Sequence, residues 1–95
     1  MRTITDIATT LDYDHTTFMN GRDSELGDEY VSAADESVRY EHGGHTLTIG
    51  TMYGYATHEI SGYAYTHDYP SGESQTDYAD SEGWIIAVIG DFMSN

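Results

Sequence analysis

Two runs of alternating apolar and polar residues flank a Gly-Gly pair in the segment SVRYEHGGHTLTIG, residues 37–50. Val38 and Tyr40 alternate with polar residues before the pair, and the same alternation resumes after it. Two residues that adopt positive φ angles between such runs are typical of a tight turn. The segment therefore predicts a β-hairpin centred on Gly43 and Gly44, and a fold built on antiparallel strands.

The two-residue period continues through residues 51–69, where tyrosines, threonines and a histidine recur. Aromatic and β-branched side chains at this period suit a pleated sheet, so the middle of the chain predicts a meander of roughly three or four strands. Before it, residues 3–12 carry apolar side chains at helical spacing, and Thr3 and Asp6 stand at capping-box spacing. The expected fold class is α+β, with a short N-terminal helix packed on a mostly antiparallel β-sheet, in a single domain covering residues 1–95.

Four other segments carry weaker signals. The pattern of residues 15–29 indicates a strand or turn that leads into a loop. The pattern of residues 28–38 indicates about one or two helical turns. Residues 70–82 are polar and acidic, which indicates an exposed loop. Residues 84–92 are apolar on both faces, which favours a central strand, with a helix as the alternative because short apolar runs fit either.

The charge is the extreme property of the composition. Seventeen acidic residues face three arginines and no lysine, for a formal net charge of −14. A globule of this length is about 32 Å across, and duplex DNA over that span carries about 19 phosphates. Direct binding to nucleic acid or to an anionic membrane is therefore disfavoured, whereas basic partners would be steered toward the protein. The longest apolar run is too short to span a bilayer, so we expect a cytoplasmic protein.

In size, charge and tyrosine–aspartate texture the whole chain resembles the small acidic inhibitors of the anti-CRISPR and anti-restriction kind, many of which are DNA mimics. The residues that carry the likeness are Asp12, Asp14, Asp23, Glu25, Asp28, Glu29, Asp35, Glu36, Asp68, Glu73, Asp77, Asp80 and Glu82. The resemblance implies a protein that occupies the positively charged nucleic-acid channel of a host-defence protein, either a CRISPR effector or a restriction enzyme. Carboxylates would stand where phosphates sit, and no catalyst or cofactor would be needed.

The partner-binding surface is expected in two acidic segments, residues 23–36 and 68–82, which together would form one contiguous negative face. Neighbouring tyrosines would add apolar contact, since tyrosine is enriched at protein interfaces. The predicted contact residues are Asp23, Glu25, Asp28, Glu29, Asp35, Glu36, Asp68, Tyr69, Glu73, Asp77, Tyr78, Asp80 and Glu82.

Two alternatives remain open at this level. Lysine depletion with abundant acidic residues also keeps the proteins of salt-loving organisms hydrated. In that case the net charge would reflect a high-salt environment and would say nothing about function. His42 and His45 flank the predicted turn and could hold a metal ion with Glu59 or His58, although zinc-type spacings are absent and no metal is expected. The chain lacks nucleophile, phosphate-loop and dinucleotide motifs, so we expect it not to be an enzyme. A homodimer is compatible with the sequence.

Overall fold

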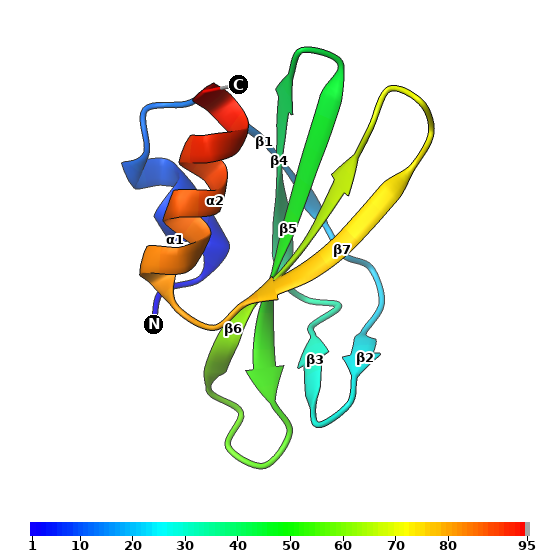
Figure 1. Ribbon diagram of the computed structural model, residues 1–95. Helices are drawn as coiled ribbons and strands as arrows, with labels where there is room; N and C mark the ends of the chain where they lie inside the picture. The colour runs from blue at the N-terminus through cyan, green and yellow to red at the C-terminus, as the bar shows by residue number, and fades with distance from the viewer. Residues whose placement is uncertain (95) are drawn as a thin grey trace.

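The computed structural model describes residues 1–94, which form two helices and seven strands (Figure 1). The predicted α+β class is confirmed: a short N-terminal helix, a curled antiparallel sheet that forms a half-barrel, and a C-terminal helix. The elements in chain order are α1 (Ile4–Thr10), β1 (Thr16–Met19), β2 (Ser24–Leu26), β3 (Glu29–Val31), β4 (Glu36–His42), β5 (His45–Gly54), β6 (Ile60–Asp68), β7 (Ser74–Ala79) and α2 (Glu82–Ser94).

The predicted hairpin at Gly43 and Gly44 is confirmed and joins β4 to β5. Both glycines have positive φ angles, 59° and 83°, as a two-residue turn of this kind requires. The strand that follows, β5, is the axis of the sheet. One of its edges pairs with β6, whereas its other edge pairs first with β4 and then with β3. The sheet consequently divides into two arms, β4–β1 and β3–β2.

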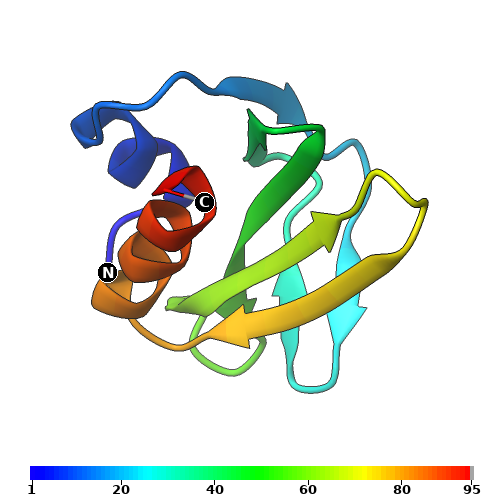
Figure 2. The same ribbon diagram turned by 45° about the horizontal axis from the view of Figure 1, so that its top comes forward.

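One face of the sheet carries the core. The period-two pattern turns Val38, Tyr40, Leu47, Ile49 and Tyr63 to the same face, and all five are buried. Figures 1 and 2 show both helices lying against this side of the sheet. The helices contribute Ile4, Ile7, Ala8, Ile85 and Ile89 to the core, and Ala79 of β7 completes the cluster.

The N-terminal helix predicted over residues 3–12 is confirmed as α1. The Thr3 hydroxyl accepts a hydrogen bond from the Asp6 N–H at 3.2 Å, which is the expected cap. The N–H of Ile4 donates to the buried Thr51 hydroxyl of β5 at 2.9 Å. The start of the helix is therefore tied to the centre of the sheet. No helix among residues 1–94 combines the length and apolar character needed to cross a membrane.

The strand expected for residues 84–92 is wrong, because these residues form α2. Ile85 and Ile89 are one helical turn apart and fully buried, and the hydroxyl of Ser81 accepts from the N–H of Trp84 at 3.1 Å. A helix buries this one stripe and leaves Trp84 54% exposed, whereas a strand would have had to bury both faces.

Two other expectations need correction. The loop expected over residues 70–82 contains β7, which pairs with β6 over residues 74–79 even though most of its side chains are exposed. The helical turns expected over residues 28–38 are absent from the described chain, which instead has β3, a turn and the start of β4 there. In both cases backbone pairing with another strand decided the conformation, and the local composition did not signal it.

Candidate functional site

The structure places nine of the thirteen predicted contact residues in two groups at opposite ends of the sheet and the other four between them, so they are spread along the sheet and not gathered on the single face expected from the sequence. The segment 23–36 forms the β2–β3 hairpin and its connection to β4, at the bottom of Figure 1. The tip of the β6–β7 hairpin, with Asp68, Tyr69 and Glu73, lies at the top beside the β4–β5 turn. Asp77, Tyr78, Asp80 and Glu82 lie between these ends, along β7 and at the start of α2.

We call the lower group the acidic end. It comprises the β2–β3 hairpin, the connection 32–36 and the β5–β6 turn. Its carboxylates are Asp23, Glu25, Asp28, Glu29, Asp35, Glu36 and Glu59. Six of these were predicted contact residues, and Glu59 joins them because β5 pairs with β3 and brings the β5–β6 turn alongside the hairpin.

Three tyrosines form the centre of the acidic end. Tyr30 lies directly opposite Tyr53 across the β3–β5 pair, and their ring centroids are 5.7 Å apart. The ring of Tyr55, which is 42% exposed, is 4.7 Å from that of Tyr30. These three residues were not among the predicted contacts. The Tyr-x-Tyr spacing at 53 and 55 was a signal, but only the pairing of β3 with β5 adds Tyr30.

Two carboxylates of the acidic end accept hydrogen bonds from a hydroxyl or a backbone amide and, within residues 1–94, are not paired with a cation. The Tyr53 hydroxyl donates to Asp35 at 2.5 Å, and Asp23 accepts from the backbone N–H of Ala33 at 2.7 Å. Burial, followed by the hydrogen bond to Asp35, raises the pKa of Tyr53 well above its usual value. Burial and Glu25 likewise raise the pKa of Tyr55. Both tyrosines therefore stay neutral donors at ordinary pH.

Two of the three arginines contact groups outside the acidic end, whereas Arg22 directly precedes Asp23 in the chain. Arg2 forms an ion pair with Glu82 at 2.9 Å, which ties the N-terminus to the start of α2. Arg39 lies over the ring of Phe18, with its guanidinium carbon 4.8 Å from the centroid. Arg22 lines a shallow groove on the sheet face opposite the helices. Over residues 1–94, no arginine forms an ion pair with a carboxylate of the acidic end.

The histidines do not form the metal site considered from the sequence. His42 and His45 lie opposite each other as expected, but His45 Nδ1 is 2.9 Å from His67 Nε2. His58 and Glu59 lie in the β5–β6 turn, at the far end of β5. Burial and the neighbouring His45 lower the pKa of His67. In the part of the chain that the structure describes, no group of three or more His, Cys, Asp or Glu residues converges to hold a metal ion.

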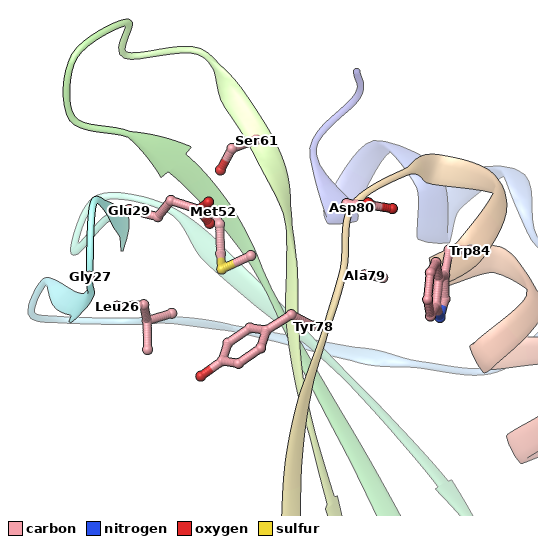
Figure 3. Close-up of a pocket in the computed structure, with 9 residues that line it drawn as sticks. All are labelled: Leu26, Gly27, Glu29, Met52, Ser61, Tyr78, Ala79, Asp80 and Trp84. Atoms are coloured by element: carbon pink, nitrogen blue, oxygen red, sulfur yellow. The ribbon is translucent and has the colours of Figure 1, made fainter.

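A cavity of about 590 Å³ opens beside the acidic end (Figure 3). Its walls come from the β2–β3 hairpin, from β5, β6 and β7, and from Trp84 of α2. Glu29 of the first predicted segment and Tyr78 and Asp80 of the second both line it. The cavity is thus the place where the two predicted segments meet.

Comparisons of the chain with family models, with curated proteins and with solved structures find no match.

Proposed function

We propose that this protein binds a basic, nucleic-acid-binding protein through the acidic end and thereby competes with nucleic acid for that protein. The observation that carries the proposal is the presence of seven carboxylates at the acidic end together with the ring contacts of Tyr30 with Tyr53 and Tyr55, with no arginine ion-paired to these carboxylates within residues 1–94. Unneutralised carboxylates steer positively charged partners toward this end, and tyrosine rings supply the buried contact area that fixes a complex.

The dimensions suit this role. The molecule measures 39 × 28 × 21 Å and carries a net charge of −14. Duplex DNA 39 Å long carries about 23 phosphates, at one charge per roughly 1.7 Å of axis. The net charge of the whole molecule is therefore of the same order as that of a duplex of its length, and the acidic end carries seven of the seventeen acidic side chains.

The proposed partner class is a CRISPR effector or a restriction enzyme, in line with the resemblance in size and charge to small acidic inhibitors of such defence proteins. The protein would act in the cytoplasm, where these partners meet nucleic acid. Occupation of their binding channel needs complementary charge and shape, and it needs no catalytic residue.

Two variants with the same change in net charge test the proposal. The first neutralises three exposed carboxylates of the acidic end with Glu25→Gln, Asp28→Asn and Glu59→Gln. The matched control carries Asp12→Asn, Asp14→Asn and Glu73→Gln, which neutralise three exposed carboxylates outside the acidic end. Competition against a labelled duplex, on a panel of CRISPR effectors and restriction enzymes, gives the affinity of each variant.

We expect the acidic-end variant to bind about tenfold more weakly, since three exposed charge pairs at about 0.5 kcal/mol each amount to that factor. The control should stay close to the unaltered protein. Equal losses in both variants would mean that net charge alone acts, without a specific surface. Displacement of no duplex from any of these proteins would remove the proposal. If the protein folded only above about molar salt, the acids would serve hydration in a salt-loving organism instead.

A further inference from the structure

The cavity beside the acidic end has apolar walls on the side of the β2–β3 hairpin. Met52, which is 4% exposed, lies at its floor, and Leu26 and Tyr78 face each other across it in Figure 3. The ring of Tyr78 is 47% exposed. A volume of about 590 Å³ is within the usual range of ligand pockets, roughly 300–1,000 Å³. We call this space the Glu29 pocket, with Leu26, Glu29, Met52, Ser61 and Tyr78 as its members.

Glu29 gives the pocket an unmatched charge. Its side chain is partly buried, and within residues 1–94 its carboxylate takes part in no hydrogen bond and no ion pair. Its oxygens remain in contact with solvent, so an entering cation would exchange that water for a direct ion pair. A cation entering the pocket would supply the missing partner.

Ser61 is a second, independent polar group without a partner. The pairing of β5 with β6 shifts register between Met52 and Tyr53, so Ser61 is the unpaired residue of a β-bulge. Its hydroxyl oxygen is buried and has no hydrogen-bond partner in the described chain. Figure 3 shows this hydroxyl and the carboxyl group of Glu29 directed toward the same space. An N–H donor placed there would bond to the Glu29 carboxylate, and it would reach the Ser61 oxygen once a small shift of the bulge uncovers that atom.

We propose that the Glu29 pocket receives an arginine side chain of the partner. This inference rests on the proposed function for the existence of a basic partner, and it names the side chain that the partner inserts. The planar guanidinium carries five N–H donors, enough to engage the Glu29 carboxylate with two parallel bonds and to donate a further one to Ser61. The methylene stem packs on Met52 and Leu26, and the face of Tyr78 offers a cation–π contact.

The same geometry selects arginine over lysine and over neutral groups. A lysine ammonium is a compact, strongly hydrated point charge that stacks less well on an aromatic ring and cannot form the two parallel bonds. No lysine or arginine of this chain lines the cavity, so nothing of like charge opposes the entering guanidinium.

The test uses the full chain and N-acetyl-arginine amide as the probe, followed by amide and indole NMR signals. The matched neutral probe is N-acetyl-citrulline amide, which keeps the shape and loses the charge. We expect saturable shifts centred on Ser61, Tyr78 and the Trp84 indole with the arginine probe, and at least about tenfold weaker binding of citrulline. Glu29→Gln should weaken arginine binding by a similar factor, whereas Glu36→Gln, which removes a charge outside the pocket, should not.

Ser61→Ala distinguishes binding in the pocket from attraction to the net negative charge, because it removes the unpaired hydroxyl and leaves every charge in place. It should weaken the arginine probe while leaving the urea midpoint unchanged or raised. Shifts spread over all carboxylates without saturation, equal binding of both probes, or no effect of Glu29→Gln would each overturn the inference.

Different results would contradict the arginine pocket and the proposed nucleic-acid-binding partner. Duplex competition that survives Glu29→Gln but not neutralisation of Glu25, Asp28 and Glu59 would overturn the arginine pocket and leave the acidic end in place. A saturable, Glu29-dependent arginine site in a protein that displaces no duplex would support the pocket and remove the proposed nucleic-acid-binding partner.

Discussion

Gly62 of β6 lies against the backbone at the end of β7, and its replacement by alanine tests the strand pairing that builds the Glu29 pocket. A Cβ atom at this position would lie 2.5 Å from the carbonyl oxygen of Ala79 and 3.3 Å from the Cα atom of Asp80. Ordinary van der Waals contact begins near 3.4 Å. Both obstructing atoms belong to the backbone and cannot rotate away, so β7 must shift or its pairing with β6 must weaken.

The expected cost is at the upper end of the range for overpacking, which is about 1–3 kcal/mol. Ala79 is fully buried and its strand is held by β6, so the carbonyl cannot yield by itself. We therefore expect Gly62→Ala to lower the free energy of unfolding by about 3 kcal/mol, a large part of the roughly 5–15 kcal/mol of a natural domain. The matched control is Gly90→Ala in α2, where the added Cβ meets no atom within 4 Å. It should raise that free energy by about 0.5–1 kcal/mol, because alanine favours a helix over glycine.

Urea unfolding, followed by the fluorescence of the single tryptophan and by circular dichroism, measures both variants at one fixed salt concentration. The two midpoints should move in opposite directions with an unchanged slope. A Gly62→Ala protein with the midpoint of the unaltered chain would refute the close approach of β6 and β7. A destabilised Gly90→Ala protein would refute the open space beside α2.

Three further predictions address the core and the titrating groups. Thr51→Val keeps the shape but leaves the N–H of Ile4 buried without its acceptor, so urea unfolding should show a loss of about 1–3 kcal/mol, against less than about 0.5 kcal/mol for Thr48→Val. Burial raises the pKa of Tyr63 to about 12, so the folded state keeps a proton that the unfolded state releases from about pH 10. Stability should therefore be complete below pH 10 and fall between pH 10 and 12, with a smaller fall in Tyr63→Phe. Burial and His45 lower the pKa of His67, so the unfolded chain takes up its proton first as the pH falls through 6.5. Stability should be complete above that pH and decline below it, and His67→Gln should reduce the decline; an NMR titration of His67 with a midpoint at or above 6.5 would contradict this.

Local signals were sufficient for part of the fold. The turn at Gly43 and Gly44 and the cap at Thr3 were predictable, because a positive φ angle and a capping hydroxyl are properties of a few adjacent residues. The apolar run of residues 84–92 did not show whether this segment is a helix or a strand. Ser81 followed by Glu82 was nevertheless an available sign of a helix start. Which faces of that run are buried depends on the sheet beneath it.

The candidate site was the least predictable part, because distant pairing assembles it. Tyr30 and Tyr53 lie 23 positions apart in the sequence and meet only through the short β3–β5 ladder. β7 is polar and exposed apart from Ala79, so its composition resembles that of a loop, and its identity as a strand comes from the backbone of β6. The sequence indicated which segments are acidic, whereas the sheet determined that Glu29 and Tyr78 share one pocket.

The charge of this chain has opposite consequences for the fold and for a complex. Repulsion among carboxylates at the acidic end destabilises the folded protein, and dissolved ions screen it, so added salt should stabilise the free protein. A basic partner removes the same repulsion by neutralising the same groups, and salt weakens that association because it screens the attraction. If the acids served hydration alone, salt would raise stability and there would be no specific association for it to weaken. The opposite signs of the two salt dependences, measured on one protein, therefore distinguish a surface for binding from a surface for solubility.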